Sequence, residues 1–321
     1  MYDITTFGEI IIDFTSQGLN EDGQMLYARN PGGAPANVAV AAKRLGAHTA
    51  FLGKAGKDMH GEYLRDVLDR EKVDTKGLIL DEKHFTTLVF VEISDSVERS
   101  FSFARKPGAD TQMEKEEVDI DVVDHTHIFH VGSLSLTDQP ARDTTFYAVK
   151  RAKAKGSIIS YDPNYRASLW SDEETAREHM RSLIPYVDMM KISDEETELL
   201  TGFASAPEAA AALFQQGVKV AAVTLGADGA YIYCKDGGLI VPGSAPSQVQ
   251  DTNGAGDSFW AGFLYKVCTC GKRPEDLGIE DLADFARFGN AVASLCIEKK
   301  GAIPAMPDLQ QVEARLHTDI Q

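Results

Sequence analysis

Residues 251–262 combine very small side chains with a carboxylate at the start of a predicted helix, a spacing that could support phosphoryl transfer. Gly254, Ala255 and Gly256 carry nothing larger than a methyl group. Backbone N–H groups at the helix start therefore stay open to an anion. Asp257 falls in the first helical turn, where a carboxylate could take the proton of an attacking hydroxyl. A glycine-rich loop capped by an aspartate is the other interpretation, and these residues alone do not separate the two.

Polar and glycine residues near the N-terminus could bind a sugar. Asp13 ends the apolar run 10–12, and a carboxylate at the end of a buried strand needs a partner, such as a pair of sugar hydroxyls. Gly32 and Gly33 would let a ligand approach the backbone. Asn37 lies on the first turn of the helix that follows, where its amide can both donate and accept hydrogen bonds.

A second polar group follows the apolar run 157–161. Asn164 and Arg166 lie within the segment 162–166, and the guanidinium offers a permanent planar charge to a ligand. A simple surface turn is the alternative interpretation, because Asp-Pro-Asn is common turn chemistry.

Strand-like apolar runs alternate with helical patterns along most of the chain. The predicted strands are 4–13, 49–54, 127–133, 157–162, 187–192 and 219–225. The predicted helices are 35–45, 58–71, 138–155, 174–184, 206–216, 255–270 and 279–299. This alternation predicts an α/β fold with a mostly parallel sheet covered on both faces. Ligands of such sheets bind at the carboxyl ends of the strands, where the polar residues described above should gather.

Two segments, 15–31 and 78–106, break the α/β rhythm with shorter alternating patterns. The runs 88–93 and 100–103 are predicted to pair as a hairpin across residues 95–96. We interpret the two segments as a small β-sheet lid over the main sheet, although separate peripheral hairpins would show the same pattern. A late hairpin is predicted for 230–241.

Composition limits the classes of function. The chain has 321 residues and a formal net charge of −17, which argues against nucleic acid or an anionic membrane as a partner. The N-terminus resembles no secretory signal and no apolar run could span a bilayer, so we expect a single cytoplasmic domain over 1–321. We expect the four cysteines to be free thiols, and the spacing of the histidines at 125–130 argues against a metal site. Neither a P-loop nor a protein-kinase catalytic loop occurs.

Two separated motifs resemble the ribokinase-like carbohydrate kinases of the phosphofructokinase-B type. The first extends from Gly32 through Asn37 to Gly46 and Gly56, and the second is 251–262. The resemblance implies a three-layer α/β/α domain with a β-sheet lid. It also implies transfer of the γ-phosphoryl group of ATP to a primary sugar hydroxyl, with Mg²⁺ as cofactor.

The resemblance also implies roles for individual residues. Asp257 matches the general base, and 254–256 match the anion hole. Asp13, Gly32, Gly33, Asn37, Arg105, Asn164 and Arg166 are the residues expected to bind the sugar. Lys191, Ser193, Glu196, Thr224, Gly226, Gly229 and Asn290 are the residues expected to bind the nucleotide, with Glu196 organising Mg²⁺ indirectly. Asp251, Asn253 and Gly301 match the loop that binds a monovalent cation such as K⁺ in many relatives.

Within the family, the runs 30–37 and 103–110 resemble fructokinases. Fructose is therefore the expected substrate and fructose 6-phosphate the expected product. The Asp-Pro-Asn-x-Arg pattern ending at Arg166 is shared with 2-keto-3-deoxygluconate kinases, so that substrate stays open. A nucleoside kinase and a non-catalytic sugar sensor are further alternatives. A homodimer through the lid is also expected, because its alternating apolar faces could pair with a second copy.

Overall fold

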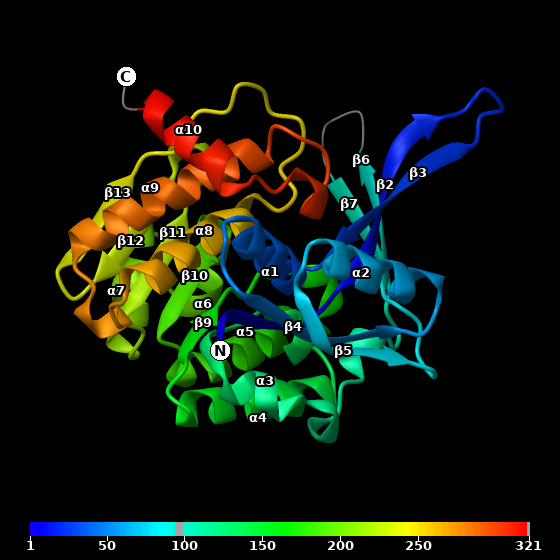
Figure 1. The fold of residues 1–321 in the computed structure, drawn as a ribbon, viewed down its shortest axis with the longest axis horizontal. Helices are drawn as coiled ribbons and strands as arrows, with labels where there is room; N and C mark the ends of the chain where they lie inside the picture. Colours follow the sequence, from blue (N-terminus) through cyan, green and yellow to red (C-terminus); the bar gives the residue numbers. More distant parts are fainter. Residues whose placement is uncertain (94–98, 320–321) are drawn as a thin grey trace.

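A nine-stranded, mostly parallel sheet forms the centre of the protein (Figure 1). The computed structural model describes residues 1–93 and 99–319. The strand order is β13-β12-β11-β10-β9-β8-β1-β4-β5. The strands are β1 (Tyr2–Phe7), β4 (Thr49–Gly56), β5 (Asp74–Asp81), β8 (Thr126–Val131), β9 (Ile158–Tyr161), β10 (Met189–Ser193), β11 (Val220–Thr224), β12 (Ala230–Cys234) and β13 (Gly237–Val241). Neighbours from β5 to β11 run parallel, and β12 and β13 add an antiparallel edge.

Helices cover both faces of this sheet because successive strand residues point to opposite sides. In β9, Ile158 packs into one apolar cluster and Ile159 into the other. The first face carries α1 (Ala34–Arg44), α2 (Met59–Arg70), α8 (Ala255–Cys270) and α9 (Ile279–Cys296), with α10 (Leu309–Asp319) packed on α9. The second face carries α3 (Ile120–Asp124), α4 (Ala141–Ala154), α5 (Glu173–Leu183), α6 (Thr197–Thr201) and α7 (Ala206–Gln215). The predicted three-layer α/β/α architecture is confirmed.

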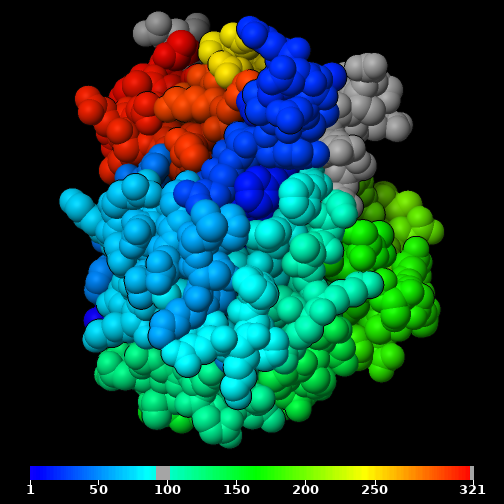
Figure 2. All heavy atoms as spheres, turned by 90° about the vertical axis from the view of Figure 1, so that its right-hand side faces the viewer, coloured from blue at the N-terminus to red at the C-terminus, as the bar shows by residue number. Residues whose placement is uncertain are grey.

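A second sheet of four strands lies at one side of the molecule, with the order β3-β2-β6-β7. Its strands are β2 (Ile11–Leu19), β3 (Met25–Gly32), β6 (Leu88–Ile93) and β7 (Arg99–Ala104). The hairpin of β2 and β3 projects from the body in Figure 1, and Figure 2 shows it in dark blue from that side. The predicted antiparallel pairing of 88–93 with 100–103 is confirmed. Its predicted turn at 95–96 lies outside the described residues.

Two predicted boundaries near this second sheet are wrong. The expected strand 4–13 is two strands, because the chain leaves the large sheet after β1 and enters the small one at β2. Gly8, with φ of 149°, lies at this break, and the apolar run 10–12 concealed it. The expected lid segment 78–106 also begins too early, since residues 78–81 belong to β5 of the large sheet.

The seven predicted helices are all present, with ends within three residues of the expected bounds. Three short or peripheral helices (α3, α6 and α10) and strand β5 were not predicted. The late hairpin is confirmed, although β13 begins at Gly237 inside the expected turn. No helix within residues 1–93 and 99–319 is both long enough and apolar enough to cross a membrane.

Candidate active site

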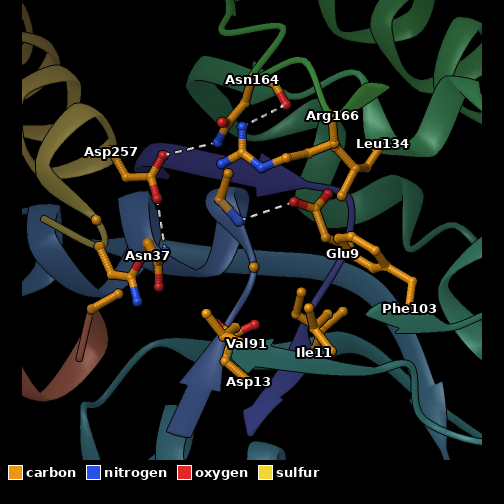
Figure 3. Close-up of a pocket in the computed structure, with 16 residues that line it drawn as sticks. Glu9, Ile11, Asp13, Asn37, Val91, Phe103, Leu134, Asn164, Arg166 and Asp257 are labelled. Carbon is orange, nitrogen blue, oxygen red and sulfur yellow. Dashed lines mark hydrogen bonds between the residues drawn. The ribbon is translucent and has the colours of Figure 1, made fainter. Parts of the chain in front are cut away.

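A pocket lies between the large sheet and the inner face of the second sheet (Figure 3). Ile11, Val89, Val91 and Phe103 form its apolar wall on the second sheet. Polar side chains reach it from the loops at the carboxyl ends of the large-sheet strands and from two helix starts. The predicted residues that line it are Asp13, Gly33, Asn37, Asn164, Arg166, Asn253, Gly254 and Asp257. Residues distant in sequence therefore meet at the expected edge of the sheet.

Helix α8 begins beside this pocket with a terminus that no side chain caps among the described residues. Gly254 precedes the helix with φ of 76°, a left-handed conformation that glycine adopts without strain. A Cβ atom on Gly254 would lie 2.9 Å from that of Ala302, so a larger residue would also collide there. Phe259, Trp260 and Phe263 bury the following turns in the core. The core therefore fixes the position of the half-buried helix start.

Asp257 stands in the first turn of α8 and is held by two amides. The Asn37 Nδ2 donates to Asp257 Oδ2 at 2.7 Å, and the Asn164 Nδ2 donates to Asp257 Oδ1 at 3.3 Å. Burial, followed by the charge of Asp162, raises the pKa of Asp257 to about 6. The carboxyl is therefore largely ionised at neutral pH yet has a much higher proton affinity than an exposed aspartate.

Asp13 enters the pocket from β2, and the two neighbouring glycines make room for it. A Cβ atom on Gly32 would lie 2.2 Å from Asp13 Oδ2, and one on Gly33 would lie 2.4 Å from the Glu9 carbonyl oxygen. Burial raises the pKa of Asp13 to about 7, against the opposing positive charge of Arg166. Both positions therefore need glycine: the Asp13 carboxyl lies against Gly32, and the Glu9 backbone lies against Gly33.

Arg166 and Arg105, which were both expected to bind the sugar, have different surroundings. Arg166 is an exposed side chain that lines the pocket. Arg105 is buried and does not line it. Its guanidinium donates to Asp110 Oδ2, Thr137 Oγ1 and the Leu134 carbonyl oxygen, each at 2.8 Å. In this arrangement Arg105 supports the pocket wall at Leu134.

A buried ion pair lies directly behind the α8 terminus. Lys191 Nζ donates to Asp162 Oδ2 at 2.9 Å. A Cβ atom on Gly256 would also lie 2.9 Å from Lys191 Nζ, so the ammonium group lies against the helix start. Burial alone would lower the pKa of Lys191, but Asp162 and Glu196 raise it, and the group stays charged. This places a positive charge beside the N-terminus of α8, where the Ala255 N–H also donates to the Thr252 carbonyl oxygen at 3.3 Å.

Glu196 is buried and uses both carboxylate oxygens to hold backbone. Its Oε2 accepts from the Ser193 N–H at 2.7 Å and the Ser193 Oγ at 3.0 Å. Its Oε1 accepts from the Tyr165 N–H at 2.6 Å. Glu196 therefore ties the loop after β10 to the loop after β9. This arrangement fits an indirect influence on a bound metal, since both oxygens already bind the protein.

A second, more apolar pocket adjoins the outer side of the α8 terminus. Gly226, Thr252, Ala255 and Asn290 line it. Further lining residues come from the loop after β13 and from α9 or its end: Gly243, Ser244, Ala245, Pro246, Val249, Ala293, Ser294 and Ile297. The Asn290 Nδ2 donates to the Pro242 carbonyl oxygen at 2.8 Å and so holds this loop.

Thr224 and Gly229 were predicted for the same pocket but are not among the residues that line it. Thr224 ends β11, and its Oγ1 lies 3.4 Å from the Ile192 carbonyl oxygen. Gly229 has φ of 98°, and a Cβ atom there would lie 2.1 Å from the Val241 carbonyl oxygen. Both residues shape the turn that carries Gly226 to the pocket.

The three residues expected to form a cation loop are brought together by one carboxylate. Asp251 Oδ1 accepts from the Asn253 N–H at 3.0 Å, and Asp251 Oδ2 accepts from the Gly301 N–H at 2.9 Å. The loop 251–254 is thereby fixed to the segment near residue 301, beside the α8 start. This arrangement orders the backbone of a loop that could bind a monovalent cation.

Glu9 is a pocket residue that the sequence interpretation missed. It lies between β1 and β2, where a single strand was expected, so its acidic side chain was assigned to that strand. The break at Gly8 was the signal that could have revealed it. Leu134 and Ala302 also line the pocket and were not predicted. Neither carries a polar side chain that could have drawn attention to it.

The α8 terminus separates the two pockets. The first pocket offers a carboxylate of raised pKa and several hydrogen-bonding groups suited to a small polyol. The terminus and Lys191 offer a site for an anion. The second pocket offers apolar surface for a flat group. Together they can hold an anion between a small polar acceptor and a larger, partly apolar donor.

Known proteins resemble the chain over nearly its full length. Residues 1–309 match the pfkB family of carbohydrate kinases. Fructokinase-2 of Oryza sativa subsp. japonica is 39% identical over 313 residues, which cover 95% of this chain and 90% of the relative. A crystal structure of a fructokinase with bound ATP from Xylella fastidiosa superposes with a TM-score of 0.93 at 34% identity, covering 100% of both chains.

A third relative is a double mutant of a Vibrio cholerae O395 fructokinase, in a crystal form with fructose, ADP and potassium ion bound. It superposes with a TM-score of 0.88 at 32% identity and covers 98% of both chains. The family match and these relatives establish the kind of protein to which the two pockets belong.

Proposed function

The chain belongs to the pfkB family of carbohydrate kinases, and we propose that it phosphorylates fructose to fructose 6-phosphate with ATP as donor. The position of the α8 terminus between two pockets supports this proposal most directly. Asn253 and Gly254 line the pocket that holds Asp257. Thr252 and Ala255 line the more apolar pocket. A nucleotide in the second pocket can therefore present its terminal phosphate to a sugar in the first.

Asp257 acts as the general base in this reaction. It takes the proton of the C6 hydroxyl as that oxygen bonds to the γ-phosphorus of ATP. The bond from the γ-phosphorus to the bridging oxygen breaks, and ADP leaves with both electrons of that bond. The N–H groups at 254–256 and the Lys191 ammonium stabilise the negative charge on the moving phosphoryl group.

The remaining polar groups of the first pocket orient the sugar. Asp13 accepts hydrogen bonds from sugar hydroxyls, while Asn37 and Asn164 position both the sugar and the Asp257 carboxylate. The backbone at Gly33 allows the sugar to approach closely. Arg166 donates to a sugar oxygen from the exposed side of the pocket.

Nucleotide binding involves the second pocket and its neighbouring turns. Asn290 and Gly226 contact the base and ribose region, and Thr224, Gly229 and Ser193 shape the surrounding loops. Mg²⁺, when bound to the ATP phosphates, would neutralise part of their charge, with Glu196 ordering the loops around it. K⁺ would bind at the loop of Asp251, Asn253 and Gly301 and reinforce the electrostatic field at the α8 start.

An acceptor survey tests this proposal. ADP release would be measured with fructose, 2-keto-3-deoxygluconate, ribose and adenosine as acceptors, with and without K⁺. We expect fructose to show the highest kcat/KM. A clear preference for 2-keto-3-deoxygluconate would contradict the fructose assignment. It would indicate that Arg166 binds the carboxylate of that substrate. Binding of fructose without turnover would instead identify a sugar sensor.

The second sheet acts as a lid that closes over the bound sugar and excludes water. A homodimer through this lid is part of the proposal. Leu19, Met25 and Leu26 are 65%, 42% and 49% exposed near the tip of the projecting hairpin. Light scattering after size-exclusion chromatography tests the dimer, and a monomer at micromolar concentration would contradict it.

A further inference from the structure

Glu9 is a buried acidic side chain of the first pocket to which the mechanism above gives no role. It lies in the link between β1 and β2 and is 2% exposed. Its Oε1 accepts a hydrogen bond from the Ala34 N–H, at the start of α1, at 3.0 Å. Its Oε2 is also buried but has no hydrogen-bond partner within residues 1–93 and 99–319. Because a buried polar atom without a partner is destabilising, this oxygen needs an explanation.

The surroundings of Glu9 favour the protonated form of its carboxyl group. Burial raises the pKa of Glu9 to about 8, and the charge of Asp110 adds to the rise. The hydrogen bonds to backbone and the charge of Arg105 oppose it without reversing it. Near neutral pH, Oε2 can therefore carry a proton and act as a hydrogen-bond donor, while Oε1 keeps its bond to Ala34.

Glu9 and Asp257 lie on different sides of the same pocket. Figure 3 shows Asp257 at the left, and Glu9 at the right beside Phe103 and below Leu134. A sugar that places its reacting hydroxyl at Asp257 must extend its far end toward Glu9. The neighbouring wall on the second sheet is apolar, and the exposed Arg166 lies above Glu9 in Figure 3, so Glu9 is a buried polar group that can meet this end of the sugar.

We propose that Glu9 donates a hydrogen bond to a sugar oxygen remote from the reacting hydroxyl and thereby selects sugars that carry an oxygen there. This inference rests on the proposed function. For fructose that reacts at C6, the remote oxygen is the C1 hydroxyl or the anomeric C2 hydroxyl. A sugar without that oxygen leaves the buried Glu9 donor unpaired, which disfavours binding and the transition state alike.

The test crosses variants of Glu9 with sugars that lack one hydroxyl. The sugars are fructose, 1-deoxyfructose and 2,5-anhydro-D-mannitol, which lacks the anomeric hydroxyl. Glu9→Met keeps the side-chain volume but removes both hydrogen bonds. Glu9→Gln keeps a donor and an acceptor. Ile11→Ala, in the apolar wall of the same pocket, is the control for a loss of packing alone. Glu9→Ala replaces the methionine variant if that variant does not fold.

We expect Glu9→Met to lower kcat/KM for fructose by about 10- to 100-fold, and by only a few-fold for the analogue that lacks the contacted hydroxyl. Glu9→Gln should stay within a few-fold of wild type for fructose. Ile11→Ala should affect all three sugars by a similar factor. An equal loss for all three sugars in the Glu9→Met enzyme would overturn the proposal and leave Glu9 a structural residue.

Failure of this inference is distinguishable from failure of the proposed function. If the wild-type enzyme does not phosphorylate fructose, the substrate assignment fails before any variant is made. The same variants are then compared on the preferred sugar and its deoxy analogues. A selective loss on the sugar that carries the remote oxygen supports the role of Glu9, and a uniform loss contradicts it.

Discussion

Replacing Asp257 with asparagine should stabilise the fold while strongly lowering turnover, because the proposed base is ionised in a buried position. The side chain is 7% exposed. Burial, followed by the charge of Asp162, raises its pKa from 3.8 to about 6. The hydrogen bond from Asn37 and the positive charges of Lys191 and Arg166 oppose this rise without cancelling it.

A rise of about two pKa units corresponds to about 3 kcal/mol in the free energy of unfolding. The folded protein binds the Asp257 proton more tightly than the unfolded chain does. The contribution of this tighter proton binding to the free energy of unfolding is therefore fully present below about pH 4. It is lost as the pH rises through about 6. Asparagine stays neutral, so the advantage of the variant should be absent near pH 4 and reach up to about 3 kcal/mol above pH 7.

Chemical denaturation of both proteins at several pH values measures this difference, and an ADP-release assay measures turnover. We expect kcat to fall by roughly 10²–10⁴ while fructose still binds by calorimetry. Asp162→Asn is the contrasting variant, since it removes the partner of the buried Lys191 ammonium at 2.9 Å and should destabilise the fold by about 3–5 kcal/mol. It also removes a charge that raises the pKa of Asp257. An Asp257→Asn protein that is less stable than wild type above pH 7, or that turns over within a few-fold of wild type, would refute the reasoning.

Three further predictions follow from the same pocket. The value of kcat/KM for fructose should decline as the pH falls through about 7 and then about 6, where Asp13 and then Asp257 become protonated; an unchanged value down to about pH 5 would contradict the assignment of the base. Gly32→Ala should lower kcat/KM by about 10²-fold without unfolding the protein, because the new Cβ atom would displace Asp13; kinetics near wild type would argue against a role for Asp13. Hydrogen exchange in the four strands of the second sheet (β2, β3, β6 and β7) should slow when fructose and an ATP analogue bind together, whereas unchanged exchange would exclude closure of the lid.

The sequence was sufficient to predict the fold class and most of the polar side chains that line the first pocket, because the motifs lie at ends of elements with strong patterns. Buried strands such as β9 and helices such as α8 show clear periodicities. Residues that follow parallel strands necessarily meet at one edge of the sheet. For that reason Asn164 and Arg166, which follow β9, could be placed at this edge. Asn37 and Asp257 lie 220 residues apart in sequence, and the family motifs that contain them predicted their meeting.

The predictions that failed or missed a residue depend on tertiary contacts with no local signature. The strand expected over 4–13 looked continuous because Ile10, Ile11 and Ile12 are apolar, yet the chain passes between two sheets there. Glu9 lies at this passage, so its burial depends on both sheets. Arg105 looked like a ligand for a sugar, but in the folded structure it donates to Asp110 and to the segment 134–137.

The position of the phosphate on the product tests the central claim most directly. The purified enzyme would be incubated with ATP, Mg²⁺ and ¹³C-labelled fructose, and the product would be identified by ³¹P and ¹³C NMR. Transfer to the primary hydroxyl held at Asp257 predicts fructose 6-phosphate as the single product, formed in equal amount to ADP. Phosphate on another carbon, or ADP formed without phosphorylated fructose, would contradict the account.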